Sequence, residues 1–231
     1  MEVLTGTCTV NKGSQFLVGL IDGISSKALH LVCSTSMKSG KKVIIHRDIK
    51  PSNVLLDSDM NGRLGDFGLA RLYDHDTDPQ TTHVVGTIGY LAPELGHTSK
   101  ATPLTDVFAF GMFLLEITCG QRPINETSQD SQCMLVDWVL ERWGSASLLE
   151  TVDSRLEGNY NIDEACLALK LGLLCSHPFS NARPTMRQVM QYLEGDTLLP
   201  EMTPTDMRFH MMAIMQNEGF EDYITGSTVN I

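Results

Sequence analysis

The sequence predicts a mainly α-helical domain with a few short strands, an α+β fold class, from two kinds of segment. Residues 104–119 are apolar on nearly every side, which is typical of a fully buried helix, and Gly120 follows them where a C-terminal cap is expected. Short apolar runs separated by turn-forming residues precede that helix, and such runs are typical of short strands. We therefore expect a domain built around one buried helix.

The predicted strands lie at the start of a zone that spans residues 43–195. They are, in chain order, 43–45, 54–56 and 63–65. An irregular segment is predicted at about 72–87, and segments of that length inside compact domains are usually functional or disordered.

Three further helices are predicted in the same zone from hydrophobic periodicity. They cover residues 134–143, residues 162–175 and a last stretch that ends near residue 194. Asn161 and Glu164 resemble a capping box at the start of the second of these helices. Pro184 suits the first turn of the last one.

The two ends of the chain have a different character. Residues 1–42 form a poorly patterned N-terminal segment that glycines and a Ser/Thr/Lys cluster interrupt, and only 16–24 and 28–33 have the pattern of weak helices. Residues 196–231 form a C-terminal tail with four methionines at helical spacing, which predicts packing against the domain. These methionines are Met207, Met211, Met212 and Met215.

The composition restricts the classes of function. The 231 residues include 17 basic and 28 acidic side chains, which gives a net charge of −11. This charge disfavours nucleic acid or an anionic membrane as the main partner. The six cysteines have no zinc-like spacing, and the sequence contains neither an apolar run of membrane-spanning length nor a secretory signal. As written, the sequence predicts a soluble chain of the cytoplasm with free thiols.

Three motifs indicate the chemistry. Residues 46–53 read HRDIKPSN, residues 66–68 read DFG and residues 92–94 read APE. Taken singly, an aspartate in a turn is usually a capping or turn residue, and DFG arises by chance in many proteins. The occurrence of all three in this order and spacing indicates phosphoryl transfer.

Each requirement of phosphoryl transfer corresponds to a residue of these motifs. The reaction needs the attacking hydroxyl, the γ-phosphate and two Mg²⁺ ions held in line. Asp48 is the candidate catalytic base, and Lys50 is expected to reach the transferred phosphate. Asn53 and Asp66 are the candidate cofactor-binding and metal-binding residues, because Mg²⁺ prefers oxygen ligands.

Residues 43–195 resemble the large lobe of a eukaryotic protein kinase. Lys50 in HRDIKPSN and Thr87 in GTIGYLAPE resemble the serine/threonine class, which implies Ser or Thr acceptors and the cofactors ATP and Mg²⁺. The segments GDFGLARLYDHD and PEMTPTDMRFH, and the stretch from GTIGYLAPE to CGQRP, resemble more closely the cytoplasmic part of the L-type lectin-domain (legume-lectin-type) receptor-like kinases of plants. This likeness runs from about Val43 to Asn230.

The resemblance also implies supporting roles for residues outside the metal and base positions. Asp106 is expected to hold the backbone of the catalytic loop as a structural residue. Glu94 and Arg183 are expected to form an ion pair that attaches the activation segment to the last helices. Arg47 suggests control by phosphorylation, in which a phosphate on Thr81 or Thr82 pairs with its guanidinium group. The alternative is that these threonines are merely solvated.

The expected fold is a protein-kinase-like large lobe without a complete small lobe. No stretch before His46 has the GxGxxG spacing of a glycine-rich loop, a strand lysine in a VAIK-like setting or a matching helix glutamate. We therefore expect weak or absent ATP binding by this chain alone. The alternatives are a non-catalytic, kinase-like interaction module and a gene fragment.

The implied partners are ATP, protein substrates and related receptor kinases. No nucleic-acid partner is expected, and no membrane span is predicted in this sequence. The full-length relatives are expected to be plasma-membrane receptors that carry this part on their cytoplasmic side.

Overall fold

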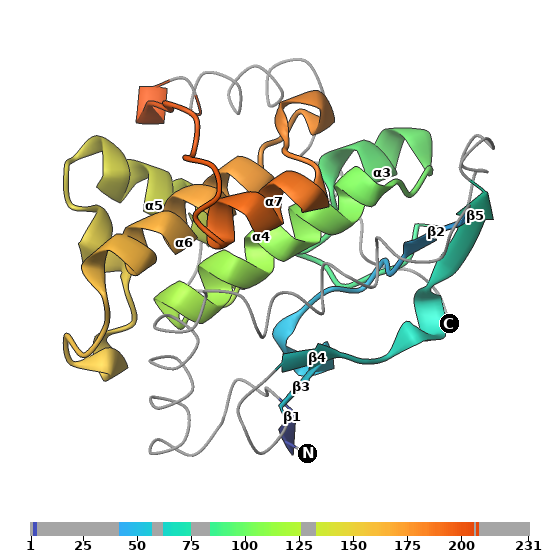
Figure 1. Ribbon diagram of the computed structural model, residues 1–231, viewed down its shortest axis with the longest axis horizontal. Coiled ribbons are helices and arrows are strands. Elements are labelled where there is room, and N and C mark those ends of the chain that lie inside the picture. The colour runs from blue at the N-terminus through green and yellow to red at the C-terminus, as the bar shows by residue number, and fades with distance from the viewer. Residues whose placement is uncertain are drawn as a thin grey trace.

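The computed structural model describes residues 2–3, 42–56, 62–74, 84–125, 133–205 and 207. The weak helices predicted at 16–24 and 28–33 lie outside these residues, as do three of the four tail methionines. Figure 1 shows a group of helices on one side of the described part and short strands on the other. The prediction of a mainly helical fold with short strands is confirmed.

Helix α4, Pro103–Cys119, lies at the centre of the helical part (Figure 1). Proline at the first helical position has no N–H to leave unpaired. Gly120 ends the helix in the left-handed region, with a φ of 67°. Every side chain from residue 105 to residue 115 is buried, so the helix is surrounded by protein as its all-apolar pattern predicts.

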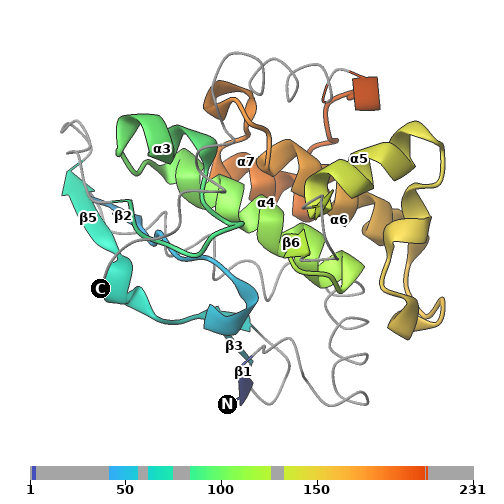
Figure 2. The same ribbon diagram turned by 180° about the vertical axis from the view of Figure 1, so that it is seen from behind.

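Helices α5 (Leu135–Gly144), α6 (Ile162–Cys175) and α7 (Met186–Leu193) pack against α4 (Figure 2). Helices α4 and α6 approach closely at Gly111 and Gly172. A methyl group added at Gly111 would lie 2.5 Å from the backbone nitrogen of Ser176, and one added at Gly172 would lie 2.7 Å from Leu115 Cδ2. The two glycines therefore allow this helix contact.

The starts of α6 and α7 depend on different capping residues. Asn161 Oδ1 accepts hydrogen bonds from two backbone N–H groups of the first turn of α6. At α7, Thr185 Oγ1 accepts from Gln188 N at 3.3 Å, and Gln188 Oε1 accepts from Thr185 N at 2.8 Å. The prediction that Pro184 lies in the first turn is wrong, because this reciprocal capping box makes Thr185 the N-cap.

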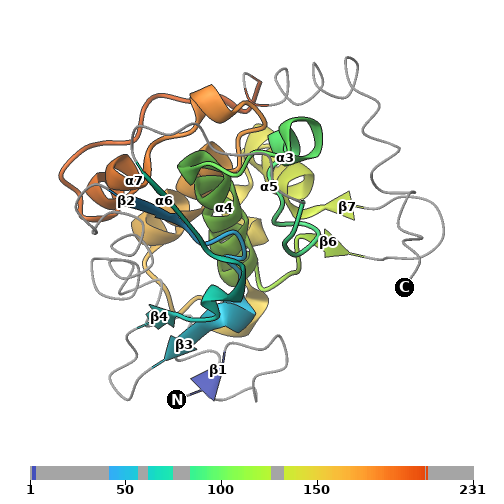
Figure 3. The same cartoon turned by 90° about the vertical axis from the view of Figure 1, so that its right-hand side faces the viewer.

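The strands among the described residues form three small antiparallel groups (Figure 3). Strand β2 (Lys42–Ile45) pairs with β5 (Arg71–Asp74), so that Val43 lies opposite Tyr73. Strand β3 lies between β1 and β4, and β6 pairs with β7. The bounds of these strands are Glu2–Val3 for β1, Val54–Leu56 for β3, Gly62–Leu64 for β4, Ile124–Asn125 for β6 and Cys133–Met134 for β7. The β3–β4 pair brings the HRDIKPSN segment beside the DFG segment.

Two of the elements that the sequence pattern does not predict are β5 and α3. Strand β5 begins just before the segment that was expected to be irregular, and its ladder partner β2 lies far away in the sequence. Helix α3, Pro93–Thr98, has only six residues and is too short to show a hydrophobic period. Tertiary pairing and local turn geometry therefore decide these two elements.

Met207 packs into the core with 4% of its surface exposed, which confirms the packing prediction for the one described member of the four methionines at helical spacing. Among the helices in the described ranges, none has both the length and the apolar composition that crossing a bilayer requires.

Candidate active site

The predicted catalytic residues lie between β2 and a 3₁₀ turn at Pro51–Asn53. The backbone bends at Arg47, whose φ of 72° is uncommon for a residue other than glycine. Asp106, in the first turn of α4, holds this bend. Its Oδ2 accepts from His46 N at 2.7 Å and its Oδ1 accepts from Arg47 N at 2.9 Å. One buried carboxylate therefore binds two consecutive backbone N–H groups.

The buried position of Asp106 makes the stability of the protein depend on pH. Burial raises the pKa of Asp106 to about 6, although the hydrogen bonds from His46 and Arg47 favour the charged form. Between about pH 4 and pH 6 the folded protein therefore binds a proton that the unfolded chain has released. As the pH rises through this window, we expect the unfolding free energy of the wild type, relative to Asp106→Asn, to fall by about 3 kcal/mol.

Urea denaturation of both proteins at several pH values measures this difference. The variant serves as the control for all other carboxyl groups, which both proteins share. A difference that stays constant between about pH 4 and pH 7 would contradict a raised pKa at Asp106.

His46 connects the HRD segment with the DFG segment. Its Nε2 lies 2.9 Å from Gly65 O, and its Nδ1 accepts from Asp48 N at 3.3 Å. Because Nδ1 accepts, Nε2 carries the hydrogen and donates to Gly65 O. Burial lowers the pKa of His46, which favours the neutral ring. The ring meets Phe67 nearly edge to face, with centroids 4.8 Å apart. His46 is not among the predicted site residues, although its place in the HRD motif could have indicated it.

Three hydrogen-bond donors surround the Asp48 carboxylate. Lys50 Nζ and Asn53 Nδ2 lie 2.8 Å and 2.9 Å from Oδ2, and Thr87 Oγ1 donates to Oδ1 at 2.8 Å. Lys50 Nζ also donates to Thr87 Oγ1 at 2.7 Å. Burial acts to raise the pKa of Asp48, but the hydrogen bonds from Lys50, Thr87 and Asn53 outweigh it and lower the pKa. Asp48 is therefore ionised at neutral pH and able to accept a proton.

The orientation of the Asn53 side chain follows from its donors. Nδ2 donates to the backbone oxygen of Asp48 at 2.8 Å and to Asp48 Oδ2 at 2.9 Å. Because both amide hydrogens are directed at Asp48, Oδ1 is the atom left to offer its lone pairs to a cation.

Asp66 follows Gly65, whose backbone is hydrogen-bonded to that of Asn53. Gly65 N donates to Asn53 O at 2.7 Å. Asp66 is exposed, has a φ of 54°, and its Oδ1 accepts from Gly68 N at 3.3 Å. Within the described ranges no group of three or more His, Cys, Asp and Glu side chains could hold a metal ion. One carboxylate and one amide oxygen suit Mg²⁺, which usually completes its coordination with water and substrate phosphate.

The Arg47 side chain reaches the segment that follows DFG. Its Nη1 is 3.4 Å from Leu69 O, and Arg71 and Tyr73 are near enough to influence its charge. Burial lowers the pKa of Arg47, and the positive charge of Arg71 acts in the same direction. Thr81 and Thr82, the predicted phosphorylation sites, lie outside the described residues.

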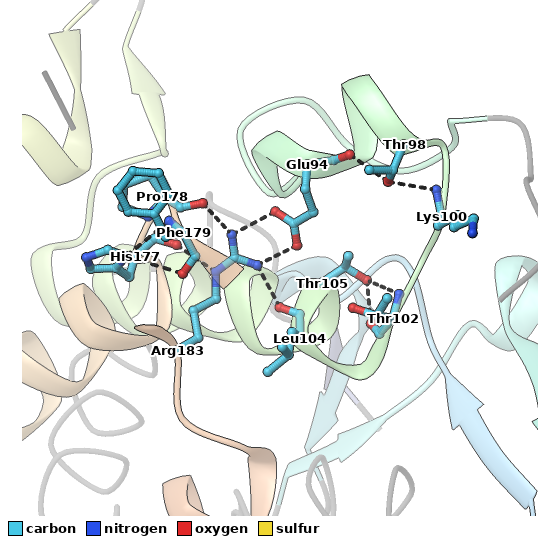
Figure 4. A network of polar contacts seen from close by, with 10 residues as sticks. All are labelled: Glu94, Thr98, Lys100, Thr102, Leu104, Thr105, His177, Pro178, Phe179 and Arg183. Carbon is cyan, nitrogen blue, oxygen red and sulfur yellow. Dashed lines mark hydrogen bonds and ion pairs between the residues drawn. The ribbon is translucent and has the colours of Figure 1, made fainter. Parts of the chain in front are cut away.

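Figure 4 shows the contacts of the Arg183 side chain. Its Nη1 and Nη2 donate to the two oxygens of Glu94 at 2.7 Å and 2.8 Å. Nη1 also donates to Leu104 O at 3.0 Å, Nη2 to Pro178 O at 3.0 Å, and Nε to His177 O at 2.6 Å. All five N–H groups of the guanidinium are therefore engaged, and they join α3, the start of α4 and the segment between α6 and α7.

The structure thus places the predicted site residues in two groups. One group consists of Arg47, Asp48, Lys50 and Asn53 of the catalytic loop together with Asp66, Thr87 and Asp106, which lie next to the loop. The other is the pair of Glu94 and Arg183. Tyr90 and Glu116, which are hydrogen-bonded to each other, are not among the predicted residues.

This combination of a catalytic loop, a DFG segment and an APE helix is that of a protein kinase. Residues 32–193 match the family model described as the protein kinase domain, and the chain belongs to this family. A protein kinase domain uses ATP and a divalent metal ion.

The particular relatives are plant receptor kinases, as the motifs predict. The chain is 56% identical over 219 residues to the L-type lectin-domain containing receptor kinase SIT2 of Oryza sativa subsp. japonica, a match that covers 95% of this chain and 32% of the relative. It is 54% identical over 190 residues to the L-type lectin-domain containing receptor kinase IV.2 of Arabidopsis thaliana, covering 81% of this chain and 27% of the relative. The chain therefore spans about a third or less of the length of these curated relatives.

Proposed function

We propose that the chain is the large lobe of a serine/threonine protein kinase of receptor-like type, which transfers the γ-phosphoryl group of ATP to protein hydroxyl groups, and that this activity is impaired in the chain because no stretch before His46 matches a glycine-rich loop or a strand lysine. The observation that carries this proposal is the Asp48 carboxylate, which has Lys50 and Thr87 hydrogen-bonded to it at 2.8 Å each. The candidate base Asp48, the ammonium group of Lys50 and the hydroxyl group of Thr87 therefore lie within hydrogen-bond distance of one another.

In the proposed reaction the acceptor oxygen bonds to the γ-phosphorus while the bond to the β,γ-bridging oxygen breaks and ADP leaves. The hydroxyl proton passes to a carboxylate oxygen of Asp48. The Lys50 ammonium group neutralises charge on the transferred phosphoryl group. Asn53 and Asp66 would hold Mg²⁺, which supplies further positive charge at the phosphate oxygens when it is bound.

Thr87 supports a serine or threonine acceptor. Its hydroxyl lies 2.8 Å from Asp48 and accepts from Lys50 at 2.7 Å, so the acceptor has to approach beside this residue. An aliphatic hydroxyl is one carbon from the peptide backbone, whereas a phenolic hydroxyl lies at the far end of an aromatic ring. A substrate backbone that is held so that an aliphatic hydroxyl reaches Asp48 therefore places a phenolic hydroxyl at the wrong distance.

Three peptides that differ only in a central Ser, Tyr or Ala test this proposal. With Mg·ATP and radiolabelled phosphate, we expect transfer to the serine peptide to be at least about tenfold faster than to the tyrosine peptide, because misplacement weakens transition-state contacts. The alanine peptide and a reaction with EDTA are the controls, and neither should incorporate phosphate. Equal rates on Ser and Tyr would contradict the acceptor class. No incorporation and no Mg·ATP binding would contradict the reaction itself.

We also propose that phosphorylation of Thr81 or Thr82 regulates this activity through Arg47. The neighbouring Arg71 supports this proposal, because two nearby guanidinium groups favour a bound phosphate. If this is correct, Arg47→Gln removes the activation that phosphorylation produces.

A second candidate function is a non-catalytic module that binds related receptor kinases. Phe67, Leu69 and Leu72 favour it, because they are 43%, 36% and 54% exposed within one short segment. A pull-down with the cytoplasmic domain of a related kinase tests this. Leu72→Glu should abolish capture, whereas Leu198→Glu, at a position that is 89% exposed elsewhere, should not.

The relatives are named receptor kinases, and this supports a location for the chain on the cytoplasmic side of the plasma membrane. ATP and protein substrates are its proposed partners there.

A further inference from the structure

Thr87 begins a tight turn, residues 87–90, that is open to solvent beside the candidate base. Thr87 Oγ1 donates to Asp48 Oδ1 at 2.8 Å, and Tyr90 N donates to Thr87 O at 3.0 Å. Ile88, at the second position of the turn, is 66% exposed. A protein substrate whose hydroxyl group reaches Asp48 therefore passes this turn and meets the exposed side chains next to it.

The segment between α4 and β6 packs directly against the turn. Pro123 is buried, and a methyl group added at Gly89 would lie 2.9 Å from Pro123 Cβ and 3.5 Å from Ile124 Cγ1. Leu135 N donates to Pro123 O at 2.9 Å, so the backbone of the segment is also tied to the start of α5. Arg122 immediately precedes Pro123, and this fixed backbone therefore places it beside the turn.

The Arg122 side chain is exposed, and its charge acts on groups that adjoin the turn. Within the described part of the chain, its guanidinium group takes part in no ion pair. Burial raises the pKa of both Tyr90 and Glu116, and the positive charge of Arg122 opposes this rise at each of them. The guanidinium group therefore lies near both side chains.

Glu116 is the opposite charge at this place, but it is less accessible to a substrate. Its Oε2 accepts from the Tyr90 hydroxyl group, and its side chain is partly buried. Burial also raises the pKa of Glu116, which favours the neutral carboxyl group. Of these two charges, that of Arg122 is the one more exposed to a bound peptide.

We propose that Arg122 is a specificity-determining residue for the protein substrate: it binds the carboxylate of an Asp or Glu that lies within about four residues of the acceptor serine or threonine. A guanidinium group suits this role, because it can donate two parallel hydrogen bonds to one carboxylate. The inference rests on the proposed function for its acceptor site and adds to it a class of substrate sequence.

Peptide binding tests this inference without requiring phosphoryl transfer. Fluorescent peptides with a central serine carry Glu, Gln or Lys at one of the four positions on either side, and fluorescence anisotropy gives their Kd for the full chain. Arg122→Gln removes the charge and Arg122→Glu reverses it. Arg187→Glu is the matched control, because Arg187 is exposed on α7, outside the turn and the catalytic loop.

At one or more neighbouring positions, we expect the wild type to bind the Glu peptide about fivefold more tightly than the Gln peptide, as one well-formed exposed ion pair allows. The net charge of −11 by itself favours the Lys peptide, so a preference for Glu identifies a local contact. Arg122→Gln should bind the Glu and Gln peptides equally, and Arg122→Glu should prefer the Lys peptide. Arg187→Glu should keep the preference of the wild type.

An equal preference for Glu over Gln in the wild type and in Arg122→Gln would overturn the inference. A wild-type preference for Lys at every position would also overturn it and would indicate Glu116 as the substrate contact. Absence of peptide binding would overturn it as well. If thermal denaturation shows Arg122→Glu to be unfolded, the comparison with Arg122→Gln decides.

The proposed function is judged separately by phosphate transfer. A chain that binds the Glu peptide through Arg122 but transfers no phosphate would contradict the kinase activity and leave this inference standing.

Discussion

Replacing Asp48 with asparagine is expected to lower kcat by roughly a thousandfold, within the range that a positioned general base contributes. The variant keeps the shape of the side chain but cannot take the proton of the acceptor hydroxyl. Its hydrogen bonds can largely survive. Oδ1 of the asparagine can accept from Lys50 and Asn53, and its amide can face Thr87, whose hydroxyl can rotate. We therefore expect little change in stability.

Radiolabelled phosphate transfer to the serine peptide, together with thermal denaturation, measures both parts of this prediction. Asp196→Asn is the matched control, because Asp196 is exposed beyond α7. A variant at position 48 that keeps more than about a tenth of the wild-type kcat would show that Asp48 is not the base. If Asp48→Asn is inactive but also unfolded, Asp48→Glu takes its place in the test. This second variant restores a carboxylate at a shifted distance and should recover part of the activity.

Replacing Arg183 with methionine is expected to lower the free energy of unfolding by about 3–5 kcal/mol, the usual cost of removing one partner of a buried ion pair. The Arg183 side chain is completely buried in its pair with Glu94, whose side chain is 22% exposed. The substitution leaves the Glu94 carboxylate and three backbone carbonyl groups without their donor. Lysine should not restore the stability, because an ammonium group cannot donate as a five-hydrogen planar fork.

Arg142→Met is the matched control for this experiment. Arg142 pairs with Glu150 at 2.9 Å, but these side chains are 45% and 64% exposed, and exposed pairs contribute below about 1 kcal/mol. Urea denaturation of both variants gives the comparison. Similar losses in the two variants would contradict a special contribution from the buried pair, and so would full rescue by Arg183→Lys.

Local features of the fold could be predicted from the sequence because they depend on neighbouring residues. The bounds of α4 follow from a continuous apolar run with proline at its start and glycine at its end. The cap of α6 follows from Asn161 in the same way. Strand β5 was not predicted, and its pairing with β2 joins residues that are distant in the chain.

The same distinction holds within the candidate site. The motifs name Asp48, Lys50, Asn53 and Asp66 because residue type and short spacing are visible in the sequence. The Asn53 amide orientation and the His46 tautomer were not predictable, since each depends on atoms that only folding brings within hydrogen-bond distance.

The sequence by itself determined the family, the chemistry to expect and the local course of the main helices. Only the tertiary structure decided that α4 holds both the catalytic loop, through Asp106, and the Thr87 turn, through Glu116. It also decided that burial and hydrogen bonds set opposite pKa shifts at Asp106 and Asp48. The reason is physical: solvent exclusion and hydrogen bonding depend on distance in space, and a motif records only distance along the chain.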